Sequence, residues 1–133
     1  MLPLRLNAAE ARPIYAQIVD QVKFGVAAGT LPPGELVPSV RELSKQLVVN
    51  PNTVARAYRD LQAEGVLEPI RGTGLQVTAG APGRCRDQRR EIVRRRLREA
   101  MEEARLSALG REEIEAMIRE EWARGNGEAG RRS

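Results

Sequence analysis

Residues 38–65 read PSVRELSKQLVVNPNTVARAYRDLQAEG and contain two sets of helix signals separated by a short break. Ser39 and Glu42 have the spacing of a capping box, in which each side chain satisfies the other residue's backbone N–H. Asn50 and Pro51 mark a second start, since Asn is a good N-cap and Pro is tolerated at the first helical position. The stretch therefore predicts two helices joined by a tight turn.

The second of these helices is predicted to have an apolar side and a polar side. Its apolar positions follow the i, i+3, i+4, i+7 spacing of a helix that packs on a core, and they are Val54, Ala57, Tyr58 and Leu61. Tyr58 shares this stripe, so we expect it in the core. Gly65 ends the helix, because glycine adopts the left-handed C-cap conformation at little cost.

The sequence before this pair predicts an extended arm over residues 1–12 and one more helix. From Pro13 onward, apolar residues recur at helical spacing until Gly29, and they are Ile14, Ile18, Val22 and Val26. Residues 31–34 read LPPG, and they cannot continue a helix because proline lacks an N–H donor and fixes φ. A turn is therefore expected before Ser39.

The sequence after the pair predicts a β-hairpin. Residues 66–70 and 75–78 are short strand candidates, and the glycines of the intervening 71–74 segment, RGTG, suit a tight turn. Three helices followed by a hairpin make a winged helix-turn-helix, so residues 1–78 are predicted to form a mainly α domain with a small β-hairpin. Residues 79–83 have no periodicity and are predicted to be a linker.

Residues 84–124 are predicted to form a tail of two helices broken at Gly110. The apolar stripes of these helices are Val93, Leu97, Met101, Ile114, Met117, Ile118 and Trp122. Two helices of this size cannot close a core alone, so a second copy with the same stripe is the simplest partner, and we predict a homodimer. Residues 125–133 are polar and are predicted to be a disordered end.

The charges of the tail are unevenly distributed. Residues 84–98 hold eight Arg, whereas residues 99–121 hold eight Glu and three Arg. The two stretches could pair within one chain or across a dimer, and the arginine-rich helix could instead contact DNA. Met117 and Trp122 could also line a pocket, which leaves an unknown small-molecule effector open.

Composition excludes several classes of protein. The chain of 133 residues has a pI of about 10.0, no His and one Cys, so zinc sites and His-dependent catalysis are poorly supplied. We expect no enzyme, no metal and no cofactor. Cys85 cannot form an internal disulfide, and it could sense oxidation only if it were exposed with a lowered pKa. No apolar run of about 18 residues is present, so the sequence favours a cytoplasmic protein without membrane contact.

A winged helix-turn-helix inserts its second paired helix into the major groove of double-stranded DNA, with the N-terminal turn facing the base edges. The candidates for base contact are Asn50, Asn52, Thr53 and Arg56. The candidates for phosphate contact are Arg41, Lys45, Arg59 and Arg71, and the hairpin tip adds Gly72 and Thr73. Asn50 is expected mainly to cap the helix, with DNA contact open to it as well, and Tyr58 is expected in the core rather than stacked on a base.

These segments resemble the DNA-binding domain of GntR-family regulators. The similarity covers about residues 11–78 and rests on residues 31–34, 38–44, 49–61, 64–65 and 71–74. The run Asn50-Pro51-Asn52-Thr53-Val54 and the short tail are similar to the YtrA subfamily. In the wider family an Arg that contacts DNA often follows the cap, but here that position is Pro51, so the role passes to Asn52 or Arg56. The hairpin also has Leu75-Gln76 where the family usually has Thr-Phe.

The resemblance implies a repressor that binds an operator, often that of a transporter operon, and that dimerises through its tail. We therefore expect a sequence-specific regulator of its own operon that binds a palindromic site as a homodimer. Two other hypotheses remain at this point. One is an architectural protein that binds DNA without sequence preference, and the other is a winged helix that docks onto a protein.

Overall fold

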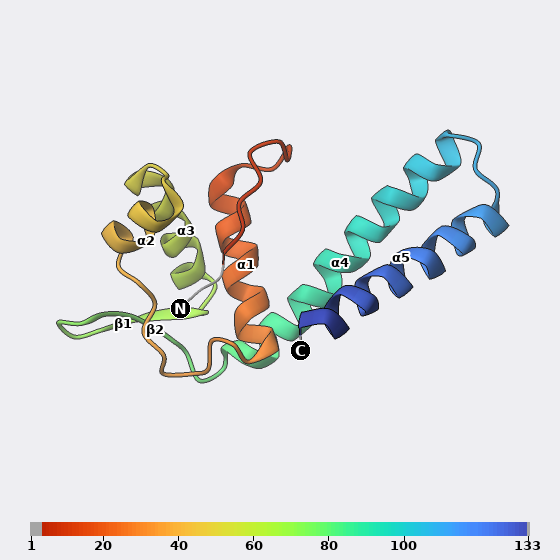
Figure 1. The fold of residues 1–133 in the computed structure, drawn as a ribbon. Coiled ribbons are helices and arrows are strands. Elements are labelled where there is room, and N and C mark those ends of the chain that lie inside the picture. The colour runs from red at the N-terminus through yellow and green to blue at the C-terminus, as the bar shows by residue number, and fades with distance from the viewer. Residues whose placement is uncertain (1–3, 133) are drawn as a thin grey trace. The chain divides into compact units, whose positions relative to one another are not determined.

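The computed structural model describes residues 4–132, and Figure 1 shows their course. The elements are α1 (Ile14–Ala28), α2 (Val40–Leu47), α3 (Pro51–Ala63), β1 (Leu67–Ile70), β2 (Gly74–Val77), α4 (Ala81–Leu106) and α5 (Arg111–Arg132). This order confirms the predicted mainly α fold, a winged helix-turn-helix followed by tail helices. The chain divides into two compact units, Met1–Ile92 and Val93–Ser133. Among the described residues, no helix is both long and apolar enough to cross a bilayer.

The core of the first unit lies between α1 and α3. Ile18 and Val22 of α1 and Val54 and Leu61 of α3 have no exposed surface. These residues belong to the two apolar stripes that the sequence predicts, and Tyr58 lies in the same core, as expected. The apolar stripes therefore set how the two helices pack.

The predicted capping box at the start of α2 is present. The Ser39 hydroxyl accepts a hydrogen bond from the Glu42 backbone N–H at 3.1 Å, and the Glu42 carboxylate accepts one from the Ser39 backbone N–H at 3.2 Å. The backbone bond and then the side-chain bond lower the pKa of Glu42 below its ordinary value. Both bonds satisfy backbone N–H groups that the helix leaves unpaired at its first turn.

Replacing the capping serine tests this local signal. We expect Ser39→Ala to lower the free energy of unfolding by about 1 kcal/mol, because one backbone N–H loses its partner. Urea unfolding measures the change, and Glu42→Gln is the control, since glutamine also completes a capping box. The pKa of Glu42 is lower in the folded protein than its ordinary value, so its negative charge stabilises the fold at any pH above that ordinary value. That contribution should fade as the pH falls through the lowered value, but Glu42→Gln should show no such titration. Equal stability of Ser39→Ala and the wild type would contradict the cap.

The β-hairpin lies at the predicted position in the chain, and a segment that the sequence does not predict to be there pairs with it. Strands β1 and β2 are antiparallel, with Leu67 opposite Val77. Residues 34–37, predicted as a plain turn, run beside β2 and form a bridge between Leu36 and Gln76. The Val77 N–H donates to the carbonyl of Glu35 at 3.0 Å. The wing is therefore anchored on its β2 side to the segment that leads into α2.

The N-terminal arm is fastened to α1. Gln17 is buried; its side-chain carbonyl accepts a hydrogen bond from the Asn7 N–H at 2.8 Å, and its amide donates to the carbonyls of Asn7 and Arg12 at 2.9 and 3.0 Å. Leu4 and Leu6 pack against the core. Residues 4–12 of the predicted arm are thus attached to α1 by hydrogen bonds and apolar contacts. Residues 1–3 lie outside the described part of the chain.

The predicted linker over residues 79–83 is wrong, because α4 already begins at Ala81. Ala81 and Cys85 have no exposed surface and belong to the core of the first unit. Arg84 donates from Nη1 to the carbonyl of Glu64 at 2.9 Å. The segment has no apolar period of its own, but Pro82 is compatible with the helix because proline is tolerated in the first turn. The start of α4 is therefore part of the first unit.

Cys85 does not meet the conditions for an oxidation sensor. Its side chain is buried, and this burial raises the pKa of the thiol, so the reactive thiolate is disfavoured. The structure therefore favours a core residue over a redox switch.

Helix α4 has two apolar stripes that meet where the units divide. The first contains Ala81, Cys85 and Ile92, and the second starts at the next residue, Val93, about 100° further around the helix. Helix α4 ends at Leu106, and Ala108 in the turn that follows has a φ of 60°. From this turn α5 folds back along the 93–106 part of α4 (Figure 1). The disordered end predicted for residues 125–133 is wrong for 125–132, since α5 continues to Arg132, and Ser133 lies outside the described residues. Hydrogen bonding along the helix continues through the glycines despite their low helix propensity.

Candidate nucleic-acid interface

The N-terminal turn of α3 is built by its cap. The Asn50 side chain accepts a hydrogen bond from the Asn52 backbone N–H at 2.8 Å, and Pro51 occupies the first turn. Asn50 therefore serves as the cap, the main role expected for it, and its contact with DNA stays a prediction. Asn52 is exposed and Thr53 is half-buried at this turn. The geometry leaves the Asn52 side chain available to a ligand.

Arg56 lies one turn further along and makes contacts that the sequence does not predict. Its guanidinium carbon is 3.7 Å from the centroid of the Tyr15 ring, and its Nη2 donates to the Tyr15 hydroxyl at 3.0 Å. Tyr15 belongs to α1, 41 residues earlier in the chain. Arg56 is an exposed residue, but its guanidinium is held against a neighbouring helix.

The other cations expected to contact phosphate are also exposed. They are Arg41 and Lys45 of α2, Arg59 of α3 and Arg71 at the hairpin tip. Within the described part of the chain, none of these four forms an ion pair. Their charges are thus available to an external anion.

The hairpin tip has the conformation that its glycines allow. Gly72 and Gly74 have φ values of 80° and 109°, a region that L side chains rarely adopt. The Thr73 N–H donates to the Ile70 carbonyl at 3.1 Å and closes the turn, which leaves Arg71, Gly72 and Thr73 exposed. Figure 1 shows the hairpin extending outward from the helices of its unit.

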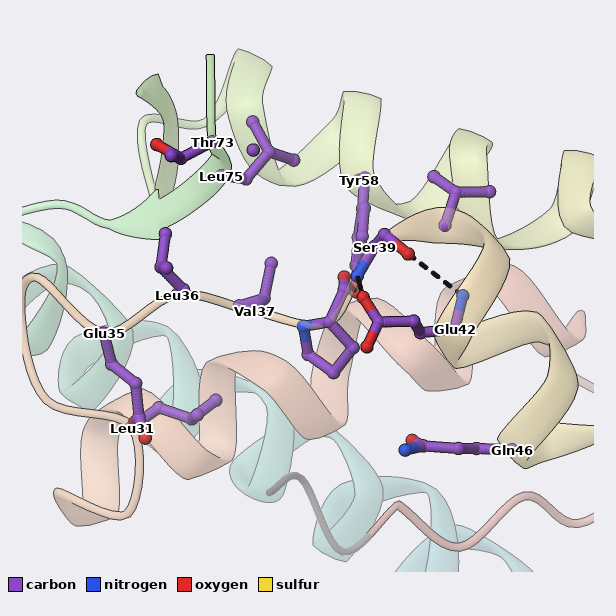
Figure 2. A pocket seen from close by; sticks show the side chains of 13 residues that line it. Leu31, Glu35, Leu36, Val37, Ser39, Glu42, Gln46, Tyr58, Thr73 and Leu75 are labelled. Atoms are coloured by element: carbon purple, nitrogen blue, oxygen red, sulfur yellow. Dashed lines mark hydrogen bonds between the residues drawn. The ribbon is translucent and has the colours of Figure 1, made fainter. Parts of the chain in front are cut away.

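A cavity of about 570 Å³ lies between α2, the segment before it and the start of β2 (Figure 2). Two of its polar lining groups have partners, since Ser39 and Glu42 cap α2, whereas Glu35 Oε2 is buried and accepts no hydrogen bond from the described residues. Tyr58 donates to the carbonyl of Pro38 at 2.6 Å, and burial, followed by the nearby charge of Glu42, raises the pKa of its hydroxyl. No group of three or more His, Cys, Asp or Glu side chains suited to a metal occurs among the described residues. The cavity therefore shows no set of converging groups that would identify a ligand.

The tail presents the seven apolar residues predicted for dimerisation. Ile114 is half-buried, whereas the other six remain exposed, with Leu97 at 56% and Trp122 at 73% of their surface. Most of the seven line a groove of about 440 Å³ between α4 and α5. The ion pairs Arg105–Glu102 and Arg111–Glu115 each join residues of one helix. Pairing between the arginine-rich and glutamate-rich stretches stays a prediction.

Sequence reasoning missed Tyr15 as a neighbour of the candidate interface. Tyr15 lies beside the apolar stripe of α1, and nothing in its spacing indicates a contact with α3. Only the packing of α1 on α3 brings the ring to Arg56.

Comparison with known proteins places the chain among bacterial regulators. Residues 14–77 match the family model described as bacterial regulatory proteins of the gntR family. The chain is 31% identical over 117 residues to the HTH-type transcriptional repressor YtrA of Bacillus subtilis (strain 168), an alignment that covers 88% of this chain and 90% of that protein.

Two solved structures agree with this result. A GntR family transcriptional regulator from Listeria monocytogenes has a TM-score of 0.65 and 32% identity, and the match covers 84% of this chain and 96% of that one. YtrA from Sulfolobus acidocaldarius, a GntR-family transcription factor, has a TM-score of 0.56 and 35% identity, with 71% and 96% covered. These relatives are regulators and not enzymes, in agreement with the expectation from the sequence. The chain therefore belongs to the GntR family of bacterial regulatory proteins, which are DNA-binding transcriptional regulators.

Proposed function

We propose that this regulator represses its own operon by binding a palindromic operator as a homodimer in the cytoplasm. The observation that carries the proposal is the exposed polar side of α3, where Asn52, Arg56 and Arg59 recur at i, i+4 and i+7 on a helix whose other side is buried. A helix with such a side fits the major groove of DNA. The repressor named among its relatives supports repression, and the family resemblance points to a transporter operon.

The residues of the interface divide into two roles in this proposal. Asn52, Thr53 and Arg56 contact base edges, because Asn can pair with adenine and Arg with guanine through two hydrogen bonds. Arg41, Lys45, Arg59 and the hairpin tip contact phosphates, since exposed cations without internal partners lose little on binding an anion. Asn50 contributes through its cap, which orients the first turn of α3.

The apolar groove of the tail supports the homodimer. Large exposed apolar side chains gathered on one surface are unusual for a monomer, and a second copy presents the same surface. Twofold symmetry of the dimer then requires a palindromic site. The centres of its two half-sites should be separated by one or more turns of DNA, each turn being roughly 10 bp. A specific Kd in the range of about 10⁻⁸ to 10⁻¹¹ M is expected at physiological salt.

Substitution of two arginines should separate the two roles. Arg56→Ala is expected to relax the preference at about one or two base pairs, at a cost of about 1–3 kcal/mol against the preferred base. Arg71→Ala should weaken binding to all sequences alike and reduce the salt dependence of affinity. Titrations against a panel of single-base variants of the operator, at two salt concentrations, measure both effects. A uniform loss from both substitutions would contradict the assignment of Arg56 to base contact.

The proposed function is tested by selecting bound duplexes from a random pool, followed by competition gel shifts with the region upstream of the chain's own gene. A repressor of its own operon should select a palindromic site, find it upstream of that gene and prefer it by orders of magnitude. Salt-dependent affinity without sequence preference would instead favour an architectural protein. Failure to bind any duplex would favour a winged helix that docks onto a protein.

A further inference from the structure

The contact between Tyr15 and Arg56 places a residue of α1 beside the polar side of the recognition helix. The Arg56 guanidinium lies over the Tyr15 ring at 3.7 Å and donates one hydrogen bond to its hydroxyl at 3.0 Å. Asp60 lies one turn along α3, at the spacing of a common helical ion pair, but no ion pair joins it to Arg56 among the described residues. Arg56 is therefore held by the ring rather than by its own helix.

The Tyr15 ring is itself held in place. Tyr15 is half-buried in the first turn of α1 and packs against the core. Helix α1 in turn packs closely on α3 through that core. The ring therefore forms a fixed surface at the edge of α3, against which the Arg56 guanidinium is held.

The contact with Tyr15 leaves the guanidinium able to bind DNA. It uses a single N–H of Nη2, whereas the other four N–H donors of Arg56 form no hydrogen bond with the described residues. An unrestrained arginine has many rotamers, and binding must select one of them. A ring that has already restricted these rotamers reduces this entropic cost.

We infer that Tyr15 is a positioning residue for DNA recognition, which orients the Arg56 guanidinium for its contact without reaching the bases itself. This inference rests on the proposed function. Through this contact, a residue of the first helix would affect recognition by the third. It predicts that changes at Tyr15 alter base preference only through Arg56.

The experiment is a double-mutant cycle on the full-length protein, with the duplex selected by the wild type and its single-base variants as probes. Tyr15→Leu is expected to relax the preference at the same base pairs as Arg56→Ala, by about two- to five-fold, the effect of losing an exposed cation–π contact. In the Arg56→Ala background, Tyr15→Leu should cause no further loss. Tyr15→Phe keeps the ring and should retain most of the preference.

Ile14→Ala is the matched control, because Ile14 is the half-buried neighbour of Tyr15 and also packs against the core. The Ile14→Ala variant should have a lower melting temperature than the wild type and the same base preference. The inference is overturned if Tyr15→Leu weakens binding to all sequences equally, or if its effect persists without Arg56. A wild-type protein that selects no duplex would instead refute the proposed function, which separates the two failures.

Discussion

Replacing Trp122 by aspartate is expected to leave a folded monomer whose affinity for a two-half-site operator is about 10²- to 10⁴-fold lower than that of the wild type. Trp122 is 73% exposed within one chain, so its side chain contributes little to the fold of that chain. In the proposed dimer it is covered by the second copy, where a charge would be buried without a partner. The loss in affinity follows because a monomer engages one half-site and loses the gain from simultaneous binding.

Light scattering after size-exclusion chromatography measures the oligomeric state, and titration with the selected operator measures affinity. Leu106→Asp is the matched control, because Leu106 is 88% exposed and does not line the tail groove. It should remain a dimer with wild-type affinity. The dimer proposal fails if both variants behave alike, or if the wild type is already a monomer at micromolar concentration.

The second large effect is expected in the core. Leu61→Ala should lower the free energy of unfolding by about 2–5 kcal/mol, because Leu61 has no exposed surface and its truncation leaves a cavity between α1 and α3. Since a domain is stable by only about 5–15 kcal/mol, much of its stability should be lost. Chemical denaturation followed by circular dichroism provides the measurement.

Gln62→Ala is the control for the core variant. Gln62 is the next residue of α3 and is exposed, so its truncation should change stability by less than about 0.5 kcal/mol. A small effect of Leu61→Ala would mean that α3 does not pack on α1 as described. The comparison separates the loss of core packing from any change in helix propensity, because both residues occupy the same helix.

The starts of α2 and α3 and the end of α3 were predictable because each depends on residues close together in the chain. Ser39 and Glu42 are three residues apart, and the cap at Asn50 acts on the N–H of Asn52. The stop at Gly65 depends on the left-handed conformation of one residue. The apolar stripes were equally readable, since helical geometry places residues three and four apart on one side.

The two errors at the ends of elements arose where short-range signals pointed away from the observed structure. Residues 79–83 contain Gly and Pro, yet Ala81 begins a helix because it and Cys85 cover an otherwise open part of the core. The polar residues near the C-terminus likewise predicted disorder, but α5 continues through them to Arg132. Propensity is a weak preference, and tertiary packing routinely overrides it.

The sequence by itself determined the order of the elements, the caps that begin α2 and α3, the buried sides of α1 and α3 and the family to which the chain belongs. Tertiary structure alone decided that residues 34–37 pair with β2, that Gln17 fastens the arm, and that Tyr15 holds Arg56. The physical reason is the range of the interactions. Caps and stripes arise from neighbours within one or two helical turns, whereas Tyr15 and Arg56 are 41 residues apart and meet only after the core between α1 and α3 has formed.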